Sequence, residues 1–266
     1  MIPNVLTIAG SDPSGGAGIQ ADLKAFAAQG AYGMAALTAL TAQNTRGVSG
    51  VHMVPPDFVG AQIAAVLEDV RVDAVKIGMI GEAPVAEAVA DALAGYAGPI
   101  VLDPVMVAKG GARLLAAEAV AAVRDRLLPM AAVVTPNLAE VADLLGRGPI
   151  ADRAGMERAA ADLRAAGARA VLLKGGHLGG EDSPDLLLDA AGAVWFEAPR
   201  VATRNSHGTG CTLAAALAAR LARGEGLAEA ARVAKAYLAG ALACADALDV
   251  GSGHGPVHHF HALWPR

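Results

Sequence analysis

Residues 5–29 read VLTIAGSDPSGGAGIQADLKAFAAQ, a short apolar run followed by a glycine-rich turn and an alanine-rich amphipathic stretch. The apolar run is typical of a buried strand, and the amphipathic stretch is typical of a helix. The same succession recurs at 72–77 before 82–93, and at 100–102 before 118–128. Strands that alternate with helices in this way predict an α/β fold with a mostly parallel central sheet and helices on both faces.

The rest of the chain continues this pattern. Further strands are expected at 35–40, 132–134 and 170–173, and a hairpin is expected from 186–188 and 194–196 around Gly192. Two long helices, at about 210–223 and about 227–248, should cover one face of the sheet. Because no fixed-period repeat and no linker divides the chain, we expect one domain over residues 1–266.

The composition excludes several classes of protein. The 266 residues are 54% hydrophobic and 18% charged, which excludes disorder. A net charge of -5, with no basic run, argues against a nucleic-acid partner. Charged residues interrupt every apolar run before it could span a bilayer, and the first residues lack the pattern of a signal peptide. With only two cysteines, we expect a reduced, cytoplasmic protein with no membrane partner.

The glycine-rich turn at 10–18 follows a predicted strand and precedes a helix, so its backbone can approach a ligand at the carboxyl edge of the sheet. It is not a Walker A loop, because no Gly-Lys-Ser/Thr follows. It does fit the dinucleotide pattern through Gly16, Gly18 and Ala21, but residues 34–46 contain no Asp or Glu for a ribose hydroxyl. A dinucleotide-dependent oxidoreductase stays open as an alternative, since Arg46 could meet a 2′-phosphate.

The segment NSHGTGCT, residues 205–212, predicts an anion site. Gly208, Thr209 and Gly210 can direct backbone N–H groups at a ligand where a long helix begins, and the helix dipole favours negative charge there. A developing phosphoryl charge would be stabilised at this point. Cys211 lies in the first helical turn, where we expect a lowered thiol pKa and a role as base or nucleophile. An acyl-transfer enzyme using Cys211 and His207 is a further alternative, although no obvious Asp or Asn partner orients the imidazole.

Polar residues also follow the later strands. Asp103 closes one strand, and its carboxylate should lie at the edge where magnesium and phosphate bind in open α/β sheets. Asn137 and Glu140 follow the next strand, where they are either ligands or an ordinary helix capping box. Lys174 ends another strand beside two glycines and can reach a polyphosphate, or it is simply a solvated lysine at a turn. The histidine-rich segment at 256–261 is interpreted as a packing or assembly segment.

Five motifs together resemble a known family, the hydroxymethylpyrimidine/phosphomethylpyrimidine kinases of thiamine biosynthesis, within the ribokinase-like superfamily. The similarity extends from about residue 4 to the end of the chain, with the motifs in the same order. The motifs are AGSDPSGGAGIQAD at 9–22, GAYG at 30–33, TAQNTRG at 41–47, KGGH at 174–177 and HGTGCT at 207–212.

The resemblance implies a three-layer ribokinase-like fold and a homodimeric enzyme that uses ATP and Mg²⁺. Such an enzyme phosphorylates 4-amino-5-hydroxymethyl-2-methylpyrimidine and then its monophosphate. Pyridoxal kinase is the alternative within the superfamily, but the stretch QNT at 43–45 favours the pyrimidine.

The resemblance also implies roles for individual residues. Gln43 would hydrogen-bond the pyrimidine edge, and the residues bordering the substrate or forming its apolar walls would be Gly10, Asp22, Met79, Val105 and Val107. Magnesium and the ATP phosphates would be held by Asp103, Asn137, Glu140 and Lys174. The anion hole would comprise the amides of Gly208, Thr209 and Gly210. Cys211, which stands where the sugar kinases of the superfamily have Asp, would be the base.

Overall fold

The computed structural model describes residues 1–106 and 115–264, whose strands form one sheet. Its order is β3-β2-β1-β4-β5-β6-β7-β8-β9. Strands β2, β1, β4, β5, β6 and β7 run parallel, while β3, β8 and β9 are antiparallel additions at the two edges. The strands are β1 Asn4–Ser11, β2 Tyr32–Asn44, β3 Gly47–Met53, β4 Ala74–Ile77, β5 Ile100–Leu102, β6 Val133–Val134, β7 Val171–Lys174, β8 Asp185–Asp189 and β9 Gly192–Phe196.

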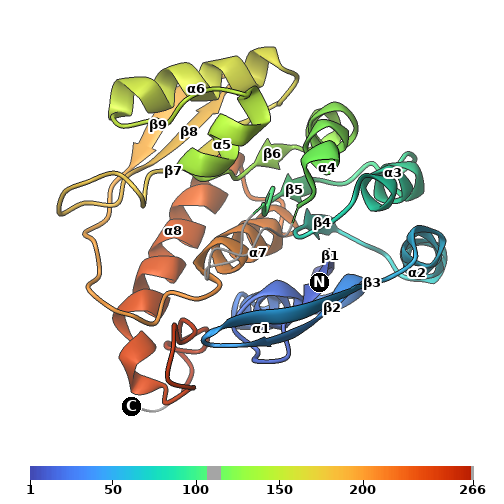
Figure 1. The fold of residues 1–266 in the computed structure, drawn as a ribbon, viewed down its shortest axis with the longest axis horizontal. Coiled ribbons are helices and arrows are strands. Elements are labelled where there is room, and N and C mark those ends of the chain that lie inside the picture. Colours follow the sequence, from blue (N-terminus) through green and yellow to red (C-terminus); the bar gives the residue numbers. More distant parts are fainter. Residues whose placement is uncertain (107–114, 265–266) are drawn as a thin grey trace.

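Helices cover both faces of this sheet (Figure 1). The helices are α1 Gly18–Ala28, α2 Pro56–Asp69, α3 Ala83–Ala92, α4 Ala117–Ala122, α5 Leu138–Leu145, α6 Arg153–Ala165, α7 Thr209–Leu221 and α8 Leu227–Ala243. A π-helical turn, Val123–Leu127, and a 3-10 turn, Leu128–Met130, continue α4, and a second 3-10 turn, Ala245–Ala247, follows α8. Helices α1, α7 and α8 pack together on one face, and α2 to α6 cover the other. The fold is therefore the expected three-layer α/β fold.

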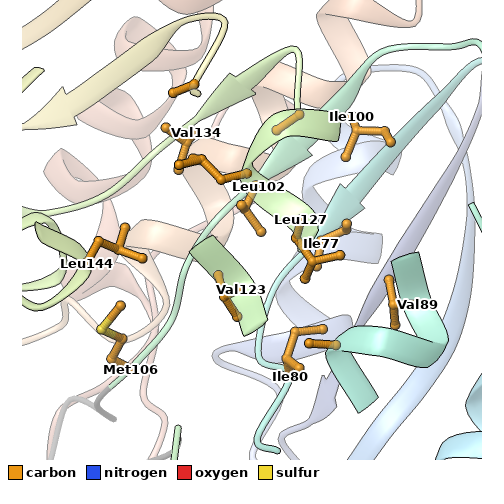
Figure 2. Close-up of a cluster of buried hydrophobic side chains, with 14 of the residues drawn as sticks. Ile77, Ile80, Val89, Ile100, Leu102, Met106, Val123, Leu127, Val134 and Leu144 are labelled. Atoms are coloured by element: carbon orange, nitrogen blue, oxygen red, sulfur yellow. The ribbon is translucent and has the colours of Figure 1, made fainter. Parts of the chain in front are cut away.

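Two hydrophobic cores, one on each side of the sheet, follow from alternation along the strands. In β1, Leu6 and Ile8 point into the core under α2 to α6, whereas Val5 points into the core under α7. Figure 2 shows the first core, where aliphatic side chains such as Ile77 and Leu102 meet residues of α3 and the turn after α4. The second core is dominated by alanines of α7 and α8, whose small side chains let these helices approach the sheet closely.

The predicted strands and the hairpin around Gly192 are confirmed, with three differences in the elements. The strand expected at 35–40 extends over Tyr32–Asn44 and pairs with β3, which the sequence does not signal, because its exposed residues give no clean alternation. The helix expected at 118–128 becomes α4 and the two turns after it, with Pro129 inside the 3-10 turn. Helices α2 and α6 were not predicted.

The C-terminal histidines take part in packing. His258 and His259 are buried, and His259 Nε2 lies 3.0 Å from Thr212 Oγ1 on α7. Phe260 stacks on Trp264 at 5.0 Å between ring centroids, so this segment acts as a packing segment against α7 and α8. Within the described residues, no helix has the length and apolar character needed to cross a membrane.

Candidate active site

A cavity of about 860 Å³ opens at the carboxyl ends of the parallel strands, against the start of α7. Twelve of the predicted site residues line it: Gly10, Gln43, Met79, Asp103, Val105, Asn137, Glu140, Lys174, Gly208, Thr209, Gly210 and Cys211. Val107 lies outside the described residues. The carboxyl ends of neighbouring parallel strands meet at one edge of the sheet, so residues far apart in the sequence converge at this cavity.

A charged cluster forms one end of the cavity. Lys174 Nζ lies 2.9 Å from Asp103 Oδ1 and 3.8 Å from Glu140 Oε2. Burial raises the pKa of Glu140 to about 7, although the Lys174 ammonium acts in the opposite direction. Burial alone would lower the pKa of Lys174, but Asp103 and Glu140 outweigh it and raise that pKa. The cluster therefore balances two carboxylates with one ammonium in a site of low dielectric constant.

The two interpretations of Asn137 and Glu140 are compatible. The Asn137 side chain accepts hydrogen bonds from the backbone N–H groups of Ala139 and Glu140, and the Glu140 carboxylate accepts one from the Asn137 N–H at 2.7 Å. This is a complete capping box at the start of α5. Because both residues also line the cavity, the cap holds the Glu140 carboxylate at a fixed place beside Lys174.

The start of α7 presents backbone amides to the cavity. Gly208 has a φ of 76°, a left-handed conformation that favours glycine, and it brings the Thr209 and Gly210 amides to the cavity. Among the residues that the structure describes, no side chain caps these amides, and the first turn holds no acidic residue. A Cβ on Gly210 would lie 3.3 Å from Lys174 Nζ and 3.5 Å from Asp103 Oδ2, so the glycine keeps the space between the helix and the charged cluster open.

Cys211 also lines the cavity, but its predicted acidity is wrong for the ligand-free protein. Burial raises the pKa of its thiol to about 11, and Asp22 and Asp103 add to this effect. The Lys76 ammonium and a hydrogen bond from the Gly18 N–H act in the opposite direction without cancelling it. The helix N-terminus is therefore not enough to produce a thiolate in the absence of ligands.

The prediction that Asp22 borders the substrate is not supported by its position. Its carboxylate is fully buried below the cavity, where it accepts hydrogen bonds from Lys76 Nζ at 2.8 Å and Thr7 Oγ1 at 2.6 Å. Lys76, its ammonium partner, lines the cavity, whereas Asp22 does not. Charge pairing explains the difference, since a carboxylate buried this deeply needs an ammonium partner.

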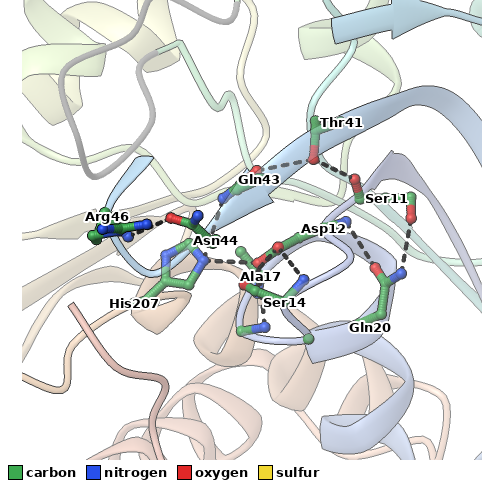
Figure 3. A network of polar contacts seen from close by, with 12 residues as sticks. Ser11, Asp12, Ser14, Ala17, Gln20, Thr41, Gln43, Asn44, Arg46 and His207 are labelled. Carbon is green, nitrogen blue, oxygen red and sulfur yellow. Dashed lines mark hydrogen bonds and ion pairs between the residues drawn. The ribbon is translucent and has the colours of Figure 1, made fainter. Parts of the chain in front are cut away.

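The contact between Asp12 and His207 was not predicted from the sequence. His207 Nε2 lies 2.8 Å from Asp12 Oδ2, and both residues are buried in the cavity wall (Figure 3). The expectation that His207 lacks an acidic partner is therefore wrong. The sequence signal was Asp12 in the first glycine-rich loop, but 195 positions separate the two residues.

A second cavity of about 430 Å³ adjoins the first. The two share the residues Asn137, Lys174, His177, Ser206, Thr209 and Gly210. Pro199, Val201 and Leu238 are among the apolar residues that line the second cavity. The turn at the start of α7 thus borders both cavities.

The donor set fits magnesium. Asp103 and Glu140 offer two carboxylates, and among the residues that the structure describes no cluster of three His, Cys, Asp or Glu side chains could hold a metal by itself. Mg²⁺ in phosphoryl-transfer sites is bound by one or two carboxylates and completes its shell with water and substrate phosphates. The residues present therefore suit a metal that arrives with a nucleotide.

An α/β sheet of this order, with an anion-binding helix start between two hollows and a carboxylate-lysine cluster beside it, defines a small-molecule kinase of the ribokinase-like class. The profile of the family described as phosphomethylpyrimidine kinase matches residues 12–258. The chain belongs to this family.

Relatives and solved structures agree with this assignment. The hydroxymethylpyrimidine/phosphomethylpyrimidine kinase of Escherichia coli (strain K12) is 55% identical over 262 residues, covering 98% of both chains. The phosphomethylpyrimidine kinase of Clostridium difficile 630 superposes with a TM-score of 0.78 at 40% identity, covering 89% of this chain and 97% of that one. An ADP complex of Bacillus subtilis pyridoxal kinase superposes with a TM-score of 0.91 at 37% identity, covering 98% of this chain and 99% of that one.

Proposed function

We propose that this chain transfers the γ-phosphoryl group of ATP to the hydroxymethyl oxygen of 4-amino-5-hydroxymethyl-2-methylpyrimidine, and then a second one to the monophosphate, in thiamine biosynthesis. The observation that carries the proposal is one cavity lined at one end by the Asp103, Glu140 and Lys174 cluster and at the other by Gln43. Its relatives bear names for both phosphorylations.

The nucleotide belongs in the smaller cavity, with its phosphates at the shared turn. Lys174 and the amides of Thr209 and Gly210 stabilise charge that develops on the transferred group. Asp103 and Glu140 hold magnesium, which neutralises the phosphate oxygens when it is bound. The pyrimidine lies in the larger cavity, with Met79 and Val105 as apolar walls and its hydroxymethyl group toward Cys211. The oxygen of that group forms the new bond to phosphorus, the bond from phosphorus to the ADP oxygen breaks, and the thiolate form of Cys211 takes the hydroxyl proton.

Pyridoxal kinase is the second candidate, favoured by the close superposition on the Bacillus subtilis enzyme. Both substrates present a hydroxymethyl group on a six-membered aromatic ring. Gln43 favours the pyrimidine, because an amide offers one acceptor and two donors and can match a ring nitrogen beside an amino group.

The test incubates the purified protein with ATP, Mg²⁺ and either hydroxymethylpyrimidine or pyridoxal, and identifies the products by mass. The expected products are the pyrimidine monophosphate and then the diphosphate. Phosphorylation of pyridoxal alone would support the second candidate, and no phosphorylation of either would reject both.

Glu140→Gln is expected to raise the Mg²⁺ concentration needed for half-maximal activity by about tenfold. The amide loses the charge that favours the metal, but it can still accept the hydrogen bond from the Asn137 N–H, so we expect the unfolding temperature to stay close to that of the wild type. The measurement is a magnesium titration of initial rates beside a thermal melt. An unchanged magnesium requirement would mean that Glu140 is only a capping residue.

Gln43→Leu is expected to weaken the binding of hydroxymethylpyrimidine by ~1–3 kcal/mol, because leucine leaves the polar edge of the bound ring unpaired. ATP binds at the opposite end of the site, so its KM should not change. KM is measured for ATP, hydroxymethylpyrimidine and pyridoxal in both proteins. If the KM values for hydroxymethylpyrimidine and pyridoxal rise equally, or if neither rises, Gln43 does not select the pyrimidine.

We further infer a homodimer, as the resemblance implies, and a cytoplasmic location, as the low cysteine content indicates. Light scattering on the purified protein measures the mass, and a monomer across the working concentration range would reject the dimer.

A further inference from the structure

The Asp12 carboxylate receives an unusual number of hydrogen bonds. Oδ1 accepts from the N–H and the hydroxyl of Ser14, and Oδ2 accepts from the N–H groups of Gly16 and Ala17. Burial would raise the pKa of Asp12, but the hydrogen bonds from His207 and Ser14 outweigh it and hold the pKa below its ordinary value. Asp12 is therefore ionised and can only accept.

The ionised Asp12 carboxylate determines which ring nitrogen of His207 carries a hydrogen. Its Nε2 lies 2.8 Å from Asp12 Oδ2, and a lone pair on Nε2 would face a carboxylate lone pair at that distance. The hydrogen must therefore be on Nε2, which donates to Asp12. The ring packs closely against Gly16, because a Cβ at that position would collide with His207 Cδ2.

The protonated Nε2 also faces the amide of Gln43. Gln43 Nε2 lies 3.3 Å from His207 Nε2, so in this orientation two donors meet. The oxygen and nitrogen of a side-chain amide are nearly identical in shape, and their places follow from their partners. Turning the amide by half a rotation puts Oε1 against the His207 Nε2–H, whose one hydrogen is then shared in a three-centre bond between Asp12 Oδ2 at 2.8 Å and Gln43 Oε1 at 3.3 Å, and no two donors meet.

The other end of the amide agrees with this orientation. Thr41 Oγ1 lies 3.1 Å from Gln43 Oε1 and donates its one hydrogen to the Ser11 carbonyl at 2.8 Å. A hydroxyl that has already donated can only accept another hydrogen bond. With the amide turned, Gln43 Nε2 donates to Thr41, and no donor faces another donor between Asp12 and Ser11.

We propose that Asp12 and His207 are positioning residues that fix the orientation of the Gln43 amide, with its oxygen toward the start of α7 and its nitrogen toward Thr41. The remaining lone pair of Oε1 then accepts from a substrate amino group on the His207 side, and the remaining N–H donates to a ring nitrogen on the Thr41 side. The pair thus selects an aromatic ring that carries an amino group next to a ring nitrogen, with the amino group on the His207 side and the ring nitrogen on the Thr41 side. This inference deepens the proposed function and rests on it for the identity of the ligand.

The first test measures the proton position directly in the ligand-free protein. ¹⁵N-labelled histidine gives each ring nitrogen a chemical shift that depends on whether it carries a hydrogen, and His207→Gln identifies the signals by their loss. We expect a hydrogen on His207 Nε2. A hydrogen on Nδ1 alone would overturn the proposal, and this result does not depend on any substrate.

The second test compares His207→Leu with His207→Gln, since a glutamine amide can put an N–H near the place of Nε2. Calorimetry measures Kd for hydroxymethylpyrimidine and for 2-methyl-5-hydroxymethylpyrimidine, which lacks the amino group. We expect leucine to raise the first Kd about tenfold and the second less than about threefold, and glutamine to restore most of the loss. His52→Leu, at an exposed position on β3, is the control and should match the wild type.

Each outcome has a meaning. Equal weakening of both ligands, or glutamine behaving like leucine, would show that His207 has only a structural role and would overturn the proposal. If the wild type binds neither ligand and phosphorylates no pyrimidine, the proposed function fails, while the proton position still decides the hydrogen-bond network.

Discussion

Cys211→Ala is expected to lower kcat by ~10²–10⁴-fold while KM changes little, because a general base acts in the transition state and contributes little to substrate binding. Its place in the cavity, in the first turn of α7, puts it beside the group that must lose a proton. Steady-state kinetics with both substrates measures the effect.

The pH dependence gives a second readout. The pKa of the Cys211 thiol is about 11 in the ligand-free protein, so the thiolate fraction increases about tenfold per pH unit between pH 7 and 9. We therefore expect wild-type activity to increase with pH over this range, and the alanine variant to lack this increase.

Cys244→Ala is the matched control, since Cys244 lies at the far end of α8 and does not line the cavity. It should keep wild-type kcat. If Cys211→Ala also kept nearly full kcat, the anion-binding turn would be sufficient for catalysis and Cys211 would be structural.

Gly208→Ala is expected to destabilise the protein by about 2–5 kcal/mol, the sum of a left-handed backbone and overpacking. A Cβ on Gly208 would lie 1.8 Å from the Gly16 carbonyl oxygen, so the two loops must separate. Their separation displaces the Thr209 and Gly210 amides, and we expect kcat to fall by about 10²-fold or more. Urea unfolding and steady-state kinetics measure the two effects.

Gly224→Ala is the control that separates the destabilisation caused by backbone strain from that caused by contact between the two loops. Gly224 has a φ of 81°, close to that of Gly208, but a Cβ there meets nothing within 4 Å. This variant should lose only about 1–2 kcal/mol of unfolding free energy and keep full activity. Equal losses of stability in the two variants would show that the contact between Gly208 and Gly16 contributes nothing.

The sequence predicts the sheet because β1, β4 and β5 carry their signal locally, as buried aliphatic runs followed by helices. It does not predict β3, whose residues are mostly exposed and follow no period of two. The residues at the strand ends, such as Asp103 and Lys174, could be placed because parallel strands bring their carboxyl ends to one edge.

Contacts between residues that are far apart in the chain cannot be predicted from local sequence. Asp22 pairs with Lys76, which lies 54 positions away, and this contact removes it from the cavity wall. The acidity of Cys211 depends on burial and on carboxylates from other elements, which a helix start alone does not reveal. Asp12 and His207 each belonged to a recognised motif, yet only the folded chain shows their contact.

The contact between the loop at 12–18 and the turn before α7 also bears on how the protein is made. The two segments lie far apart in the chain, so the turn before α7 obtains its support only when both have been synthesised and have met. Contacts over such separations are slow to form, because closing a long loop of chain costs conformational entropy. A growing polypeptide on the ribosome therefore has its first strand and loop long before it has a working site. It cannot consume ATP until the last quarter of the chain has emerged and docked.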